Sequence, residues 1–120
     1  MFKPEIPILK RTIDLYKTCY SFRNFVSKQD RYSLWTKCED KIIEILETIM
    51  SIPNREPAEK AKMLGSISLN LNVLRVFLRL AKEIKSLDNK KYIELQSIID
   101  EIGRMLGGWI KNPNKQSTLV

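Results

Sequence analysis

Histidine is absent from the 120 residues of this chain, and cysteine occurs only twice. Without histidine, a catalytic triad that uses histidine as its base and a histidine-ligated metal site are both excluded. The two cysteines, Cys19 and Cys38, lie within apolar helical patterns, where a free thiol behaves as a small hydrophobic side chain. We therefore expect two buried thiols, no disulfide framework, no metal and no cofactor.

Glycine and proline are also scarce, with four and five residues respectively. No Asn-Gly or Asp-Gly pair marks a tight hairpin, and no glycine-rich sequence has the spacing of a phosphate-binding loop. Gly103, Gly107 and Gly108 are embedded in a helical pattern. These absences favour long helices with short connections, and they leave no motif for catalysis, so we expect that the chain is not an enzyme.

Long apolar runs are missing as well. The most apolar region, residues 63–80, is interrupted by two asparagines and two arginines, and no apolar run of signal-peptide length follows Met1. We therefore expect a cytoplasmic protein that does not span a membrane.

What the sequence does contain is a helical repeat of apolar residues with a period of 3.6. It predicts four helices, over about residues 7–26, 31–52, 57–86 and 89–110. Asp30 and Asp88 are expected to cap the second and fourth helices, and Pro57 suits the first turn of the third. Short connections favour an all-α, antiparallel up-down-up-down four-helix bundle over residues 1–111, followed by a flexible tail over 112–120.

The first predicted helix has two apolar stripes where an outer helix of a monomeric bundle needs one. One stripe consists of Ile6, Leu9, Ile13, Tyr16 and Tyr20, and the other of Ile8, Leu15, Cys19, Phe22 and Val26. The third helix is also widely apolar, which indicates association between subunits. The aromatic residues Tyr16, Tyr20, Trp35, Tyr92 and Trp109 have core or interface spacing, so we do not expect a surface for stacking bases. Phe77 is the exception and is expected to face a partner.

The formal net charge is +7, which favours a polyanionic partner such as a nucleic acid. The excess of positive charge lies in residues 1–30 and 53–85. Arg75, Arg79 and Lys82 fall at i, i+4 and i+7 on one helical face, a spacing that suits backbone phosphates. The full set of candidates is Arg75, Arg79 and Lys82, then Lys10, Arg11 and Lys17, and then Arg104. For each of them, a solvated helix face remains the alternative.

Several segments, in this order and spacing, resemble the accessory variability determinant (Avd) proteins of diversity-generating retroelements. They are residues 7–16, 30–34, 74–84, 87–92 and 101–109. The resemblance covers about residues 6–111. It implies a homopentameric barrel of four-helix bundles whose basic surface binds a reverse transcriptase and the template-repeat and spacer RNA, or DNA. The accessory protein would support mutagenic reverse transcription, while the polymerase chemistry belongs to the reverse transcriptase.

A related family is encoded in intervening sequences of bacterial 23S ribosomal RNA genes. Its typical Ser-Ile-Pro-x-Asn-Ile-Ala-Glu-Gly segment begins similarly at Ser51 to Asn54, but Arg55-Glu56-Pro57 departs from it, so the Avd family is favoured. Two other functions stay open. One is a structural protein–protein adaptor whose charge serves only solubility, and the other is a role at a membrane surface. The sequence leaves the number of subunits and the preferred RNA undetermined.

Overall fold

Four long helices account for most of residues 6–113, the part of the chain that the computed structural model describes. The elements are α1 (Pro7–Ser21), the 3₁₀ turn η1 (Arg23–Phe25), the short α2 (Lys28–Arg31), α3 (Leu34–Ser51), α4 (Pro57–Glu83) and α5 (Asn89–Lys111). No strand occurs among the described residues. The all-α class and the four helices predicted from the sequence are therefore confirmed. The expected tail lies largely outside the described residues, because its residues 114–120 are not among them.

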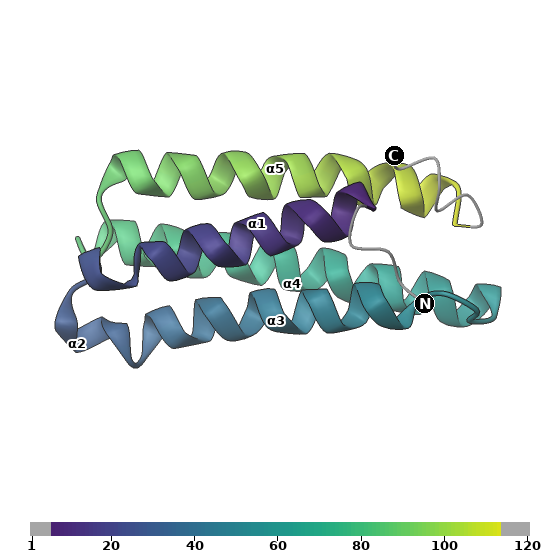
Figure 1. The fold of residues 1–120 in the computed structure, drawn as a ribbon, viewed down its shortest axis with the longest axis horizontal. Coiled ribbons are helices and arrows are strands. Elements are labelled where there is room, and N and C mark those ends of the chain that lie inside the picture. Colours follow the sequence, from purple (N-terminus) through teal and green to yellow (C-terminus); the bar gives the residue numbers. More distant parts are fainter. Residues whose placement is uncertain (1–5, 114–120) are drawn as a thin grey trace.

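Each long helix packs against two others, so that the four form a closed ring around one core (Figure 1). α1 packs on α3 and α5, and α4 packs on the same two helices from the other side. The connections before α3 and before α5 lie at one end of the molecule, and the connection before α4 lies at the other (Figure 1). The result is an elongated body that measures 43 × 23 × 22 Å.

Two tryptophans fill much of the core, and both are completely buried. The indole N–H of Trp35 donates to the carbonyl oxygen of Cys19 at 3.1 Å, which satisfies the one polar group of that ring. Most of the remaining core consists of isoleucine and leucine from all four long helices. In α1, the buried side chains are Ile8, Leu9, Thr12, Leu15 and Cys19. The second predicted stripe is therefore the core-facing one, together with Leu9.

The connection between α1 and α3 differs from the sequence-based expectation. The first helix ends at Ser21 instead of continuing to residue 26, and the next long helix begins at Leu34. Asp30 does not cap a helix: it lies inside α2, and its carboxylate accepts hydrogen bonds from the hydroxyls of Ser27 and Ser86. The prediction of Asp30 as an N-cap is wrong because these partners hold its side chain elsewhere.

The connection between α4 and α5 fits the prediction more closely. Asp88 caps α5, since its side chain accepts from the backbone N–H of Lys91 at 2.8 Å, as expected. α4 ends at Glu83, three residues before the predicted end. The helix stops there because the N–H groups of Ser86 and Leu87 both donate to the carbonyl of Ala81, with Lys85 in the left-handed region at φ 64°.

Among the helices that the structure describes, α4 is the one whose length and composition would allow it to cross a membrane. The sequence-based expectation used a different criterion, an uninterrupted apolar run, which Arg75 and Arg79 break in this helix, so it stays a prediction. Six of its apolar residues are nevertheless buried in the bundle, namely Leu64, Ile67, Leu71, Leu74, Leu78 and Ala81. The core helix of a bundle can have the same length and composition, so this feature is only weak evidence for a span.

The thiols of Cys19 and Cys38 are both free and completely buried, as predicted. Burial disfavours the thiolate, so it raises the pKa of the Cys38 thiol to about 12, and it raises the pKa of the Cys19 thiol as well. The neighbouring Cys38 thiol and Glu39 carboxylate raise the pKa of Cys19 further. Both thiols are therefore expected to resist alkylation as long as the bundle is folded.

This burial predicts a loss of stability at alkaline pH. The folded-state pKa values lie above the ordinary value of 9.0, so the unfolded chain loses protons first as the pH rises. Above about pH 9, each thiol should lower the free energy of unfolding by about 1.4 kcal/mol per pH unit. The measurement is urea denaturation between pH 7 and 11, compared with the double variant Cys19→Ala, Cys38→Ala. If the free energy of unfolding fell equally steeply with pH in the two proteins above pH 9, this account would be contradicted.

Candidate nucleic-acid and subunit interfaces

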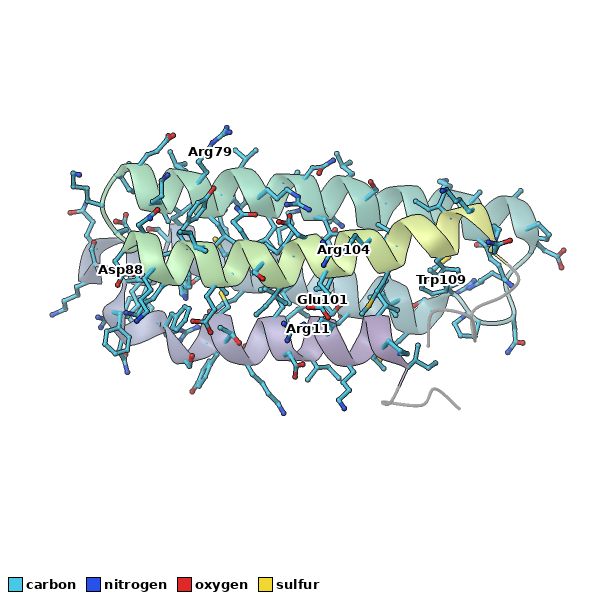
Figure 2. The ribbon with its side chains drawn as sticks, turned by 90° about the horizontal axis from the view of Figure 1, so that it is seen from above. Arg11, Arg79, Asp88, Glu101, Arg104 and Trp109 are labelled. Atoms are coloured by element: carbon cyan, nitrogen blue, oxygen red, sulfur yellow. The ribbon has the colours of Figure 1, made fainter. Side chains whose placement is uncertain are left out.

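Four of the seven predicted cationic residues are exposed on the outer surface. Lys10 and Lys17 are exposed on α1, Arg79 on α4 and Arg104 on α5. Figure 2 shows Arg79 pointing outward from α4, and Arg104 on the neighbouring α5. Within residues 6–113, none of these four side chains forms an ion pair with a carboxylate. Their charges are therefore open to a phosphate from outside.

Arg11 is placed differently, because it lies in the seam between α1 and α5. Its Nε donates to Glu101 Oε1 at 2.9 Å, and its Nη1 lies 3.3 Å from Asp14 Oδ2. Figure 2 shows Arg11 and Glu101 pointing toward each other from the two helices. With two carboxylates already beside it, Arg11 joins α1 to α5 and has little net charge left for an external anion.

Arg75 likewise joins two helices. Its guanidinium donates to Asp100 and, at 3.4 Å, to Gln96 Oε1, and both partners belong to α5. The absence of a side chain at Gly103 makes room for it, since a Cβ there would lie 3.3 Å from Arg75 Nη2. The structure therefore separates the predicted stripe: Arg79 is exposed, whereas Arg75 is engaged within the bundle.

Lys82, the third member of that stripe, is half-buried and lies over an aromatic ring. Its ammonium nitrogen is 4.8 Å from the centroid of Tyr92 in α5, a cation–π distance. This contact orients the ammonium without neutralising it. Lys82 therefore keeps its charge at the end of α4, next to the connection that leads into α5.

Exposed aromatic rings gather at this same end, contrary to the sequence-based expectation. Tyr20 is 58 % exposed, Phe25 68 % and Tyr32 74 %, and they belong to the end of α1, to η1 and to the turn after α2. Tyr20 was expected among the core or interface aromatics. It is exposed because its position in α1 lies far around the helix from Ile8 and Leu15. Phe25 and Tyr32 carried no periodic signal, since neither lies in a long helix.

Basic side chains accompany these rings. The guanidinium carbon of Arg23 is 5.6 Å from the Tyr20 centroid, and Lys91 Nζ is 4.4 Å from the centroid of Phe25. Arg23 also donates to the buried carboxylate of Glu39, and this hydrogen bond raises the pKa of the guanidinium above its usual value. The backbone and side-chain hydrogen bonds from Lys91 lower the pKa of Asp88, so this cap remains ionised at neutral pH.

Exposed apolar side chains form two groups, besides the single residues Ile93 and Ile110 on α5. The first, which we call the α4 apolar face, follows the spacing i, i+4, i+7, i+11 and i+15 and consists of Leu69, Val73, Val76, Leu80 and Ile84, of which Val73 is half-buried and the others are exposed. Helical geometry turns this face away from Arg75 and its α5 partners. Phe77, expected to face a partner, is partly buried against the core. The second group lies on α3, where Ile43 and Met50 are exposed. They are on the same side of this helix as Glu39, which faces α1 and η1.

No group of three or more histidine, cysteine, aspartate or glutamate residues that could hold a metal ion occurs within residues 6–113. The features that remain are surfaces: exposed cations, an aromatic and basic end, and two apolar faces. Such surfaces, on a bundle of four helices, are typical of small helical proteins that bind other macromolecules.

The particular family follows from comparison with known proteins. The model of the bAvd-like family matches residues 6–113, so the chain belongs to this family and is an Avd-type protein. The resemblance noted in the sequence is thereby confirmed. No curated protein and no solved structure matches the chain. Membership in this family points to an accessory protein of a diversity-generating retroelement, associated with components of that element.

Proposed function

We propose that this protein is a non-catalytic accessory subunit that binds the reverse transcriptase and the template-repeat and spacer RNA of a diversity-generating retroelement, in the cytoplasm. The observation that carries the proposal is the set of exposed cations Lys10, Lys17, Arg79 and Arg104, which have no carboxylate partner within the described residues. Their charge suits phosphates, and membership in the bAvd-like family supports the rest of the role.

The proposal includes a homopentameric barrel of antiparallel bundles, each formed by one domain over residues 1–111. A cyclic ring joins each subunit to the next through two different surfaces, whereas a twofold dimer uses one surface twice. The α4 apolar face and the exposed α3 residues Ile43 and Met50 are two such surfaces on different helices. Alternation of the connections between the two ends of the molecule supports the antiparallel path (Figure 1).

The charges allow a direct test of RNA binding. Glutamine in place of Lys10, Lys17, Arg79 or Arg104 should weaken binding of a structured RNA and reduce its dependence on salt. Each phosphate contact that is lost lowers the slope of log K against log salt concentration by about 0.7 to 0.9. The measurement is a titration of labelled RNA by fluorescence anisotropy at several salt concentrations, with all four replacements also combined in one variant.

Lys37→Gln is the matched control, because Lys37 is an exposed lysine of α3 that is not among the candidates. It should leave the slope unchanged. A wild-type protein that binds the polymerase but no RNA, or a fourfold variant with undiminished RNA affinity, would overturn the RNA part of the proposal. The first of these results would favour the protein–protein adaptor.

A further inference from the structure

A hollow of about 580 Å³ lies where the connection between α4 and α5 meets η1. It is lined by Phe25, by Lys82 in the last turn of α4, by Lys85 in the connection after it and by Asn89 at the start of α5. Glu83, Ser86, Leu87 and Asp88 complete its wall. Lys91 lies beside it, because its ammonium group is over the Phe25 ring. We call Phe25, Lys82, Lys85, Asn89 and Lys91 the Phe25 surface.

We propose that the Phe25 surface binds an unpaired segment of single-stranded RNA, with a base stacked on Phe25 and neighbouring phosphates near the three lysines. This inference rests on the proposed function and deepens it, since it assigns the place and the chemical form of the RNA. Stacking on an exposed ring beside positive charges is a common means of holding single strands without reading their sequence.

The ring of Phe25 is suited to this contact by its position. It belongs to a 3₁₀ turn that is anchored from behind: the guanidinium of Arg31 donates to the carbonyls of Arg23, Asn24 and Val26 at 3.2 to 3.3 Å. Lys91 Nζ lies 4.4 Å from the centroid of Phe25, yet the residue remains 68 % exposed. A large apolar surface is thus held in a fixed place and open to solvent.

The charges around the ring favour a phosphate-bearing ligand. Asp88 accepts hydrogen bonds from the backbone and the ammonium of Lys91, which leaves this carboxylate engaged within the chain. Lys82 is held over Tyr92 on the side of the hollow. Lys85 is exposed and has no ion pair with a described carboxylate. The wall also holds the exposed carboxylate of Glu83, and the charge of Lys91 is shared with Asp88. Lys82 and Lys85 are the two ammonium groups of the hollow that have no ion pair with a described carboxylate, and they lie next to an exposed ring.

The same composition argues against a protein partner and against double-stranded RNA as the ligand of this hollow. Protein–protein interfaces are depleted in lysine, whereas Lys82 and Lys85 line this hollow and Lys91 lies over the Phe25 ring. Double-stranded RNA offers phosphates, but its bases are already stacked on one another and cannot lie on Phe25. An unpaired strand is the ligand that can use both the ring and the charges.

The test compares wild type with Phe25→Ala and Phe25→Trp in binding to a labelled 12-nucleotide oligouridine and to a 12-base-pair RNA duplex. Phe25→Ala removes the ring on which one base stacks. This loss should weaken binding of the single strand by about tenfold. Phe25→Trp should restore or increase it, and neither variant should change duplex binding by more than about twofold. Ile110→Ala is the control, since Ile110 is an exposed apolar residue at the other end of α5.

A second readout locates the contact directly. Irradiation of the complex with a 5-iodouridine oligonucleotide should attach the strand to Phe25, as identified by mass spectrometry of the digested protein. Unchanged single-strand affinity in Phe25→Ala, or an equal loss with single strand and duplex, would overturn the inference while leaving the proposed function in place. Loss of reverse-transcriptase binding alone would assign this surface to the protein partner. Absence of any RNA binding by the wild type would instead overturn the proposed function.

Discussion

Replacement of Trp35 by alanine is expected to lower the free energy of unfolding by about 3 to 5 kcal/mol. Trp35 is completely buried, in contact with a core built from all four long helices. Its removal leaves a cavity that the surrounding side chains can fill only in part. A domain of this size has about 5 to 15 kcal/mol of stability in total, so this one change should remove a large fraction of it.

One conservative variant at this position and one exposed control elsewhere test this account. Trp35→Phe keeps an aromatic ring in the core but loses the indole donor and part of the ring volume, and the Cys19 carbonyl then still accepts from the backbone N–H of Phe22 at 3.2 Å. It should therefore cost much less than alanine. Tyr32→Ala removes an exposed ring and should change stability by less than about 0.5 kcal/mol. Urea denaturation measures all three, and equal losses for Trp35→Ala and Tyr32→Ala would contradict the placement of Trp35 in the core.

The second large effect concerns assembly. Aspartate in place of both Val76 and Leu80 is expected to dissociate the proposed pentamer into monomers of 14.1 kDa. Both residues are exposed on the α4 apolar face, so the monomer itself should tolerate the change. Burial of two carboxylates without partners at every subunit contact costs several kcal/mol per contact, which an interface of moderate size cannot offset. Light scattering after size exclusion measures the mass.

Ile93→Asp is the matched control for this experiment. Ile93 is exposed on α5 to a similar degree but lies outside the α4 apolar face. It should leave the mass of the assembly unchanged, and circular dichroism should show the same helical content in both variants. A wild-type mass of 14.1 kDa, or a double variant that assembles as the wild type does, would exclude this face from the subunit interface.

The helices and the core were predictable because both follow from short-range periodicity. Trp35 and Trp109 lie in the core-facing repeat of their helices together with isoleucines such as Ile42, Ile49 and Ile102, and the structure buries all of them. The ends of the helices were less predictable. Asp30 and Asp88 each precede a helical pattern and look alike in the sequence, but only Asp88 caps a helix. The difference is the contact of Asp30 with Ser86, which is 56 residues away.

The surface shows the same limit. The spacing of Arg75, Arg79 and Lys82 correctly describes positions along one helix, but it carries no information on the neighbouring helix. Arg75 meets Asp100 and Gln96 only because of the register between α4 and α5. The exposed rings of Phe25 and Tyr32 were missed for a related reason. They lie in the connection between α1 and α3, which has no regular repeat of apolar residues, so its sequence does not separate buried from exposed aromatic residues.

The position of the Phe25 surface at one end of the bundle has a consequence for a ring of subunits. In any assembly with cyclic symmetry, equivalent points lie on one circle around the axis, so every copy of this surface would occupy the same rim. A strand held at one ring would then be kept at high effective concentration near the next. Individually weak and exchangeable contacts could hold an RNA firmly in this way and still let it advance one nucleotide at a time.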